Sequence, residues 1–241
     1  KDGDWWYVEN GRITFTCNGL VKGLVNGNDT WWYVTGSRVN FCDTVASNAY
    51  GWWKITNGRV DFDFTGLAEN AYGWWKITNG QVDFGYVGYE QNGSNWWYVY
   101  GGQVCFQTTD VLPGIVSGQY GWWKVCEGKV NFDDDVCENA YGWWKITTGK
   151  VDFQYTGLAQ NACGWWMIQD GRVNFGSNGL VDNGNGWWLV KNGCVDFTYN
   201  GLVDNGNGWW LIANGRVDFN YQGYVQNEYG IWWVSNGQVQ F

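Results

Sequence analysis

The sequence predicts an all-β protein, a β-hairpin solenoid of about eleven repeats of about 22 residues each. Three observations support this class. One short unit recurs along the whole 241-residue chain, a Gly-containing two-residue turn lies at the centre of each copy, and apolar side chains alternate with polar ones on both sides of that turn. Periods of 20 to 50 residues indicate solenoids, propellers or arrays, and alternation with a period of two indicates strands.

The clearest copy is residues 51–72, GWWKITNGRVDFDFTGLAENAY. Its two predicted strands, residues 52–56 and 59–63, are joined by Asn57-Gly58. Asn-Gly between alternating strands favours a type I′ turn, because both central residues of that turn need a positive φ. With Trp52 as position one, position five pairs with position eight and position three with position ten.

The alternation assigns each side chain of this unit to one of two faces. We expect the core face to carry Trp53, Ile55, Val60, Phe62 and Phe64. The second tryptophan of every unit is therefore predicted to be buried. The other face is expected to carry Trp52, Lys54, Thr56, Arg59, Asp61 and Asp63.

Position three lies across from position ten, which predicts cross-strand ion pairs on the outer face. The pairs are Lys54–Asp61, Lys76–Asp83 and Lys145–Asp152. Such a pair contributes about 0.2–1 kcal/mol.

The units form a larger pattern. They begin at Trp5, Trp31, Trp52, Trp74, Trp96, Trp122, Trp143, Trp165, Trp187, Trp209 and Ile231, and ten of the eleven turns have Gly at their second position. The intervals 26, 21, 22 and 22 occur twice, which gives a second period of 91 residues. We therefore expect a single repeat array over residues 1–241: a four-hairpin block at 5–95, a duplicated block at 96–186 and three further hairpins at 187–241.

Composition excludes several partners. A net charge of −9 without histidine argues against nucleic acid and anionic membrane surfaces, which need clustered Lys and Arg. The chain has no run of eighteen apolar residues, so we expect no membrane insertion. Its first residues, KDGD, do not resemble a signal peptide. We expect a soluble chain, either a processed secreted protein or a piece of a longer one.

Seven cysteines are scattered over different repeat positions, with no spacing typical of zinc ligands. In a solenoid a cysteine reaches only its own or the next unit. If the compartment is extracellular, the candidate disulfides are Cys17–Cys42, Cys105–Cys126 and Cys137–Cys163, with Cys194 free. The alternative is that these residues are simply small, unbonded side chains.

The order of the motifs, an aromatic strand, a turn Gly, a second strand ending in an aromatic residue, then Gly-Leu-Ala or Gly-Leu-Val and a return to Gly-Trp, covers nearly the whole chain. It resembles the cell-wall-binding repeats of Gram-positive surface proteins, a group that includes choline-binding and glucan-binding modules. It is most similar to a variant from gut bacteria with GWW and NG-x-VDF motifs. The resemblance implies a secreted or wall-attached location and a wall or glycan ligand.

In choline-binding modules, aromatic residues of successive hairpins enclose a quaternary ammonium group. This chain lacks their Trp-Tyr-Tyr strand and has Val-Asp-Phe as its partner strand, so the resemblance does not assign the cage residue by residue. The candidate ligand-binding residues are instead the outer tryptophans, as stacking platforms or cation cages: Trp52, Trp74, Trp143, Trp165, Trp187 and Trp209. The alternative is that each packs under a connector tyrosine such as Tyr50, Tyr72 or Tyr141.

No catalytic, metal or cofactor site is expected. A glycosidase needs one specialised carboxylate pair in a pocket, whereas Asp61, Asp83, Asp152, Asp196 and Asp218 recur at one repeat position. The acidic turns at residues 133–135, 182–185 and 204–207 match no calcium loop and are expected to be solvated turns.

Two functions follow from these observations. The first is a non-catalytic module that binds a cell-wall polymer or glycan, possibly choline-bearing, through its outer aromatic residues. The second is a structural or adhesive rod that binds host protein or associates with itself. Repetition gives multivalency to either.

Overall fold

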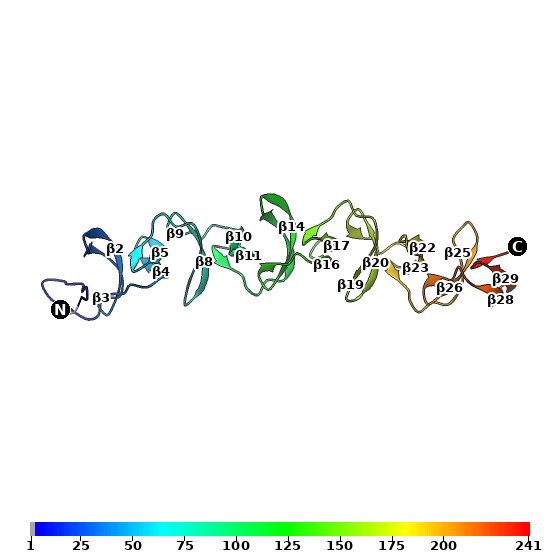
Figure 1. Ribbon diagram of the computed structural model, residues 1–241, viewed down its shortest axis with the longest axis horizontal. Coiled ribbons are helices and arrows are strands. Elements are labelled where there is room, and N and C mark those ends of the chain that lie inside the picture. The colour runs from blue at the N-terminus through cyan, green and yellow to red at the C-terminus, as the bar shows by residue number, and fades with distance from the viewer. Residues whose placement is uncertain (1–2) are drawn as a thin grey trace. The chain divides into compact units, whose positions relative to one another are not determined.

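The computed structural model describes residues 3–241, and the regular structure in that range consists of antiparallel β-strands (Figure 1). The predicted all-β hairpin-repeat class is therefore confirmed. The chain forms two compact units. Of the described residues, the first contains 3–109, 113–121 and 125–130, and the second contains 110–112, 122–124 and 131–241.

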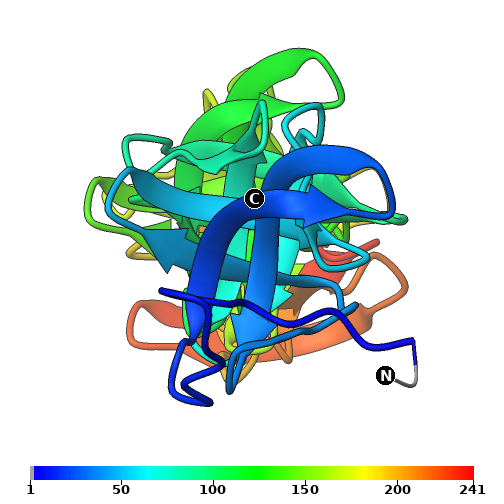
Figure 2. The ribbon, with the colours of Figure 1, turned by 90° about the vertical axis from the view of Figure 1, so that its left-hand side faces the viewer.

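The first unit contains strands β1 (Gly19–Val25), β2 (Asn28–Thr35), β3 (Arg38–Val39), β4 (Thr44–Asn48), β5 (Gly51–Thr56), β6 (Arg59–Val60), β7 (Gly66–Asn70), β8 (Gly73–Thr78), β9 (Gln81–Val82), β10 (Gly88–Asn92), β11 (Asn95–Tyr100), β12 (Gln103–Val104) and β15 (Lys129–Val130). Two strands contribute residues to both units: β13 (Asp110–Val116) and β14 (Gln119–Cys126). Within the first unit, successive hairpins are rotated relative to one another, as the blue and cyan ribbons of Figure 2 show.

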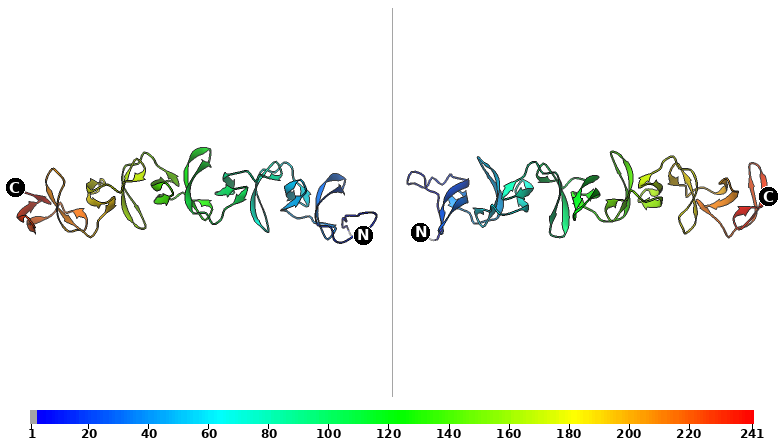
Figure 3. Two further views of the ribbon diagram at one scale, coloured as in Figure 1. Left: turned by 180° about the vertical axis from the view of Figure 1, so that it is seen from behind. Right: turned by 90° about the horizontal axis from the view of Figure 1, so that it is seen from above.

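The second unit continues with β16 (Asp135–Asn139), β17 (Gly142–Thr147), β18 (Lys150–Val151), β19 (Gly157–Asn161), β20 (Gly164–Gln169), β21 (Arg172–Val173), β22 (Gly179–Asp182), β23 (Trp187–Lys191), β24 (Cys194–Val195), β25 (Gly201–Asp204), β26 (Trp209–Ala213), β27 (Arg216–Val217), β28 (Gln222–Asn227), β29 (Gly230–Ser235) and β30 (Gln238–Val239). Its hairpins follow one another in chain order (Figure 3). No helix in the described range could cross a membrane.

The predicted turn is confirmed in the Trp52 repeat; we name each repeat by its first residue. Asn57 and Gly58 have φ values of 48° and 77°, as a type I′ turn requires. Thr56 pairs with Arg59, and the Asp61 N–H donates to the Lys54 carbonyl over 2.9 Å. The backbone register predicted for positions three to ten is therefore correct.

A longer hairpin lies on the other side of β5, where the sequence suggested only a connector. Strand β4 pairs with β5 from Thr44↔Ile55 to Asn48↔Gly51. Each regular repeat therefore has three strands, and the short strand after the Asn-Gly turn is the third. The long hairpin was missed because its turn, Ala49-Tyr50, has neither Asn-Gly nor Asp-Gly at its centre.

Successive repeats stack through the turn glycine. The Gly80 N–H donates to the Phe64 carbonyl, and the Gly80 carbonyl accepts from the Lys54 N–H, both over 2.8 Å. A Cβ on Gly80 would lie 2.5 Å from the Asp61 carbonyl oxygen. Glycine is thus needed both for its positive φ and for the close approach of the preceding repeat.

The core prediction is partly correct. Ile55 and Val60 are buried as predicted, with 0% and 5% exposure, and the equivalent residues form the core in the other regular repeats. Phe62 was predicted to be buried but is 47% exposed. The third strand ends early because the backbone of Trp53 pairs with Gln81 of the next repeat, so Phe62 leaves the strand alternation.

The prediction that every second tryptophan is buried is wrong for most repeats. Trp32, Trp75 and Trp123 are buried, whereas Trp6 is 37% exposed and the others are half-buried. Four of the half-buried rings, Trp97, Trp166, Trp188 and Trp210, contact the outer tryptophan of the preceding repeat.

The predicted ion pairs Lys54–Asp61, Lys76–Asp83 and Lys145–Asp152 do not form. The three lysines are buried, with 8%, 6% and 8% exposure. Their ammonium groups face other carboxylates, in the pairs Lys54–Asp43 at 3.9 Å, Lys76–Glu90 at 2.7 Å and Lys145–Asp134 at 3.4 Å. The face that the sequence assigned to solvent is covered by the segment entering the next repeat, whose aromatic rings Phe64, Tyr86 and Tyr155 lie 5.3–5.7 Å from these ammonium groups.

All seven cysteines are free thiols in the structure, so none of the bonds Cys17–Cys42, Cys105–Cys126 and Cys137–Cys163 is formed in it. Cys194 and Cys42 are partly buried, and this burial raises the pKa of both thiols.

Candidate aromatic binding sites between repeats

All six candidate tryptophans, Trp52, Trp74, Trp143, Trp165, Trp187 and Trp209, are half-buried at the boundary with the following repeat. Each tryptophan is the first or second residue of the middle strand of its repeat. At five of the six, the ring contacts a tryptophan of the next repeat. Two arrangements of aromatic rings result, and they differ in whether the two tryptophans touch.

Five of the six tryptophans lie in what we call closed clusters. In each, the outer ring contacts the second tryptophan of the next repeat, with centroids 5.0–5.5 Å apart, and also its phenylalanine. The clusters are Trp52/Trp75/Phe84, Trp74/Trp97/Phe106, Trp143/Trp166/Phe175, Trp165/Trp188/Phe197 and Trp187/Trp210/Phe219. Tilted and edge-to-face packing of this kind stabilises aromatic pairs by about 0.5–1.5 kcal/mol beyond burial.

Three other boundaries form what we call open boxes. There the outer tryptophan contacts a connector tyrosine and the second tryptophan contacts its own phenylalanine, and no ring contact between the two tryptophans is found among the described residues. The boxes are Trp31/Tyr50/Trp53/Phe62, Trp122/Tyr141/Trp144/Phe153 and Trp209/Tyr229/Trp232/Phe241.

The first open box encloses a cavity of about 300 Å³ lined by Trp31, Asn48, Tyr50, Trp53, Val60 and Phe62. The second box has the same four ring types 91 residues further on, so the duplicated blocks repeat it. Tyr50, Tyr141 and Tyr229 are 67–72% exposed, which leaves one wall of each box accessible.

A connector asparagine fixes the second tryptophan of each open box. Asn48 Oδ1 accepts from Trp53 Nε1 over 3.1 Å and from the Tyr50 N–H over 2.8 Å, and so positions two walls at once. Asn139 and Asn227 make the same two contacts in the other boxes. This preorganises the rings before a ligand binds.

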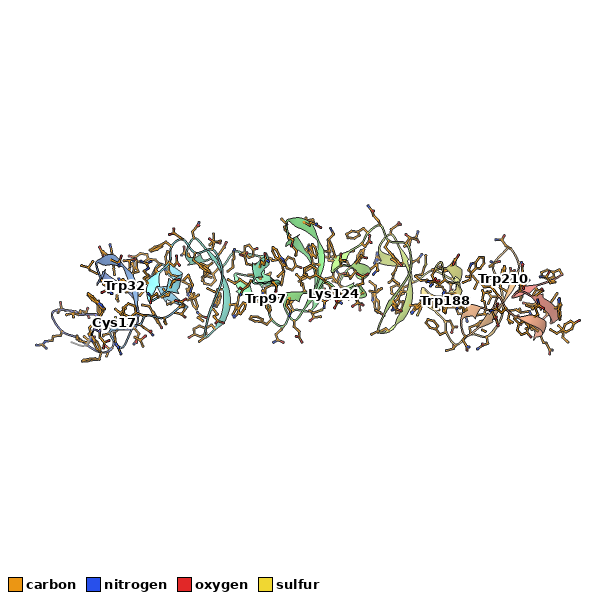
Figure 4. The ribbon with its side chains drawn as sticks, viewed as in Figure 1. Cys17, Trp32, Trp97, Lys124, Trp188 and Trp210 are labelled. Carbon is orange, nitrogen blue, oxygen red and sulfur yellow. The ribbon has the colours of Figure 1, made fainter. Side chains whose placement is uncertain are left out.

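The closed clusters vary at the indole nitrogen. In two of them the second tryptophan donates to a connector asparagine as in the boxes, Trp75 to Asn70 and Trp166 to Asn161, both over 3.0 Å. In three of them the N–H of the second tryptophan is buried without a partner: Trp97, Trp188 and Trp210, all labelled in Figure 4. An unsatisfied buried donor costs about 1–3 kcal/mol. In these three clusters the ring contacts are present without the asparagine bond.

The third box has an acidic neighbour. A hydrogen bond from the Tyr229 hydroxyl to the Glu228 carboxylate, together with the charge of that carboxylate, raises the pKa of Tyr229. The phenol is therefore neutral at pH 7, and the carboxylate adds negative potential at the rim.

Sequence reasoning identified Trp209 but missed the other members of the open boxes as ligand-binding candidates. It proposed Tyr50, Tyr72 and Tyr141 only as covers for the candidate tryptophans. Tyr72 contacts the candidate Trp52, whereas Tyr50 and Tyr141 contact Trp31 and Trp122, which were not candidates. Each open box is preceded by Asn-Ala-Tyr-Gly, or by Asn-Glu-Tyr-Gly at the last one, but the same motif at residues 70–73 precedes Trp75 of a closed cluster. The motif alone therefore does not distinguish the two arrangements.

Comparison with known proteins gives the following. No curated protein matches the sequence. Among solved structures, choline binding protein F from Streptococcus pneumoniae is 16% identical, with a TM-score of 0.36, over 98% of this chain and 97% of that chain. CbpF in complex with ipratropium is 15% identical, with a TM-score of 0.32, over 100% and 91%. Alternansucrase in complex with isomaltononaose is 12% identical, with a TM-score of 0.29, over 99% of this chain and 18% of that chain.

The family model described as the choline-binding repeat matches more than half of the chain, over residues 1–14, 19–40, 43–61, 63–83, 154–174, 176–196 and 198–218. These matches follow the hairpin repeats seen in the structure. The protein belongs to the family of choline-binding repeat proteins.

Proposed function

We propose that this protein is a non-catalytic module of the cell surface that binds a wall polymer through quaternary ammonium groups, such as choline, held in its open aromatic boxes. The observation that carries this proposal is the first box, where four aromatic rings line an accessible space of about 300 Å³, and the same four ring types recur at two further boundaries. Aromatic faces attract a quaternary ammonium group through the ring quadrupole, and the interaction contributes about 0.5–2 kcal/mol per ring.

Charge supports a cationic ligand. The chain carries a net charge of −9, which attracts cations and repels polyanions that lack them. Several boxes on one chain would each bind weakly, while a polymer with repeated ammonium groups would gain avidity. Membership of a family of binding repeats, and repeats that lack a specialised carboxylate pair, support a module without catalysis.

The outer tryptophans have two roles in this proposal. Trp209 forms a wall of an open box. Trp52, Trp74, Trp143, Trp165 and Trp187 keep a half-exposed ring in closed clusters, which would add flat contact surface for the same polymer. Replacing Trp74, Trp165 and Trp187 with alanine would then lower retention on purified cell walls without removing choline binding.

The direct test removes the exposed wall of two boxes. We expect Y50A/Y141A to lose two of the three choline sites in isothermal titration calorimetry, because a quaternary ammonium needs rings on several sides. Y50F/Y141F keeps the rings and is expected to bind like the parent. Y100A is the control, since Tyr100 is 64% exposed and belongs to no box.

Unchanged choline binding in folded Y50A/Y141A would refute the boxes as ammonium sites. If the parent bound neither choline nor cell walls but formed a stoichiometric complex with a host protein or with itself, the module would be an adhesive rod instead.

A further inference from the structure

Two polar grooves, one in each unit, lie apart from the open boxes and are related by the 91-residue period. The Lys54 groove has a volume of about 490 Å³ and the Lys145 groove about 920 Å³. Their shared lining consists of the equivalent pairs Asp43/Asp134, Lys54/Lys145, Leu67/Leu158, Ala68/Ala159, Trp74/Trp165 and Asn92/Asn183. The same groove is therefore present in both of the duplicated blocks.

Each groove contains a buried lysine with hydrogen-bonding capacity left. Lys54 Nζ donates to the Ile55 carbonyl over 2.7 Å, and Lys145 Nζ donates to the Ile146 carbonyl over 2.6 Å. Lys145 also contacts Asp134 over 3.4 Å. Because an ammonium group has three N–H donors, at least one remains at each lysine for a ligand or for water.

A tryptophan ring lines one side of each groove. Trp74 and Trp165 pack against Trp97 and Trp188 in closed clusters, yet both also line a groove. In the Lys54 groove, the Trp74 indole N–H is fixed by the Glu69 carboxylate over 2.8 Å. One ring thus combines a packing contact with a surface held in place for a ligand.

The charges define what fits. The Lys54 groove is lined by Asp43, Asp61 and Glu69 against one lysine. The Lys145 groove is lined by residues 133–135, all aspartates, against Lys145 and Lys124, the latter labelled in Figure 4. The negative excess disfavours an anion, and the buried ammonium disfavours a cation. Donors, acceptors and an indole surface together match a neutral ring that carries hydroxyl groups.

We propose that each groove binds one neutral hexopyranose unit of a glycan, with the C–H face of the sugar on the tryptophan and its hydroxyls on the lysine and the carboxylates. The site shares no residue with the open boxes, so the inference stands whether or not those boxes bind choline. The volumes of both grooves lie within the range of small-ligand sites.

The repeats themselves show how such a groove is closed. In the Trp74 repeat, Glu90 occupies the position of Ala68 and Ala159, and its carboxylate reaches Lys76 over 2.7 Å. In the Trp187 and Trp209 repeats the lysine is replaced by Leu189 and Leu211, both buried. The small alanine and the lysine are therefore both required for an open polar groove.

The test places a glutamate, as found at Glu90, at the alanine of both grooves. The probes are a glucose tetramer and an N-acetylglucosamine tetramer, measured by calorimetry and by saturation-transfer NMR. We expect the parent to bind at least one of them at two sites and A68E/A159E to bind at least tenfold more weakly, with choline binding unchanged. A tetramer of uronic acids is the anionic control and is expected to bind more weakly than either probe.

A second variant keeps the proposal testable if A68E/A159E does not fold. K54M/K145M removes the ammonium groups and uses the residue that Met167 supplies at the same position of the Trp165 repeat, so its circular dichroism should match that of the parent. It is also expected to bind at least tenfold more weakly. If the parent binds neither tetramer, or if either folded variant binds as well as the parent, the proposal is overturned.

Discussion

Repeats with lysine at position three differ from those with leucine there, although they share the same strands and turns. Lys54 and Lys145 bury an ammonium group in a space where Leu189 and Leu211 of the second unit bury only hydrocarbon. Burying a charge is costly unless it is paired. The lysine repeats therefore contain a polar interior that the fold does not need, because the leucine repeats form without it.

The residue eleven positions earlier also differs between the Lys54 and Lys145 repeats and the leucine repeats; Lys76 has Thr65 there and pairs with Glu90 instead. Asp43 and Asp134 precede the lysines, whereas Asn178 and Asn200 precede the leucines. All four accept a hydrogen bond from the next turn's backbone N–H over 2.7–2.9 Å. Capping the turn thus needs only an oxygen atom, and at Asp43 and Asp134 the same residue also supplies the carboxylate that pairs with the lysine.

The largest effect is expected from placing a lysine in a leucine repeat. L189K should lower the free energy of unfolding by about 3 kcal/mol, because the buried ammonium would meet the neutral Asn178. L189K/N178D should recover part of that loss. Urea denaturation measures both, and equal stability of L189K and the parent would show that position three is open to water in both kinds of repeat.

The turn glycines should behave alike in the two kinds of repeat. G80A and G215A each place a Cβ within 2.5 Å of a carbonyl oxygen of the preceding repeat, and both positions have a positive φ. We expect each substitution to lower the free energy of unfolding by at least about 2 kcal/mol. G206A is the control, since Gly206 has φ +83° with nothing within 4 Å and should cost only about 1 kcal/mol for strain.

A difference of more than about 1 kcal/mol between G80A and G215A in the urea midpoint would mean that position three influences the stacking of repeats, and that the two kinds of repeat differ in more than their polar interior.

The smallest effect is expected from the reverse replacement. K145L should change the free energy of unfolding by no more than about 1 kcal/mol, because a buried ion replaced by hydrocarbon is often neutral or stabilising. The Asp134 side chain is 60% exposed, so it remains solvated, and it still accepts the Thr148 N–H over 2.7 Å. Loss of fold in K145L would show that the lysine is structural.

The same variant has a pH signature. The Thr148 N–H, and to a smaller extent Lys145, lower the pKa of Asp134 below its usual value of 3.8. A lowered pKa stabilises the fold above pH 3.8, and this contribution is lost as the pH falls below that value. In K145L the pKa of Asp134 should rise but stay below 3.8, which an NMR titration of labelled aspartate carboxyls would detect.

The sequence identified the outer tryptophans as the residues to test, but it did not separate open boxes from closed clusters. Trp31 and Trp122 were outside its candidate set, although they have the same position as Trp52. The two arrangements use the same pair of tryptophans and differ only in how the rings of adjacent repeats meet. That contact depends on packing between repeats, which the alternation within one hairpin does not describe.

By itself the sequence determined the repeat, the Asn-Gly turn, the strand register around it and the buried Ile55–Val60 pair. These features are local: a two-residue turn with positive φ fixes which residues face each other, and alternation fixes which side they take. Only the tertiary structure decided that Trp53 pairs with Gln81 of the next repeat, that Phe62 is exposed and that Lys54 is buried. Each of these depends on a partner about one repeat away, because the backbone groups and the outer face of one hairpin are completed by its neighbour.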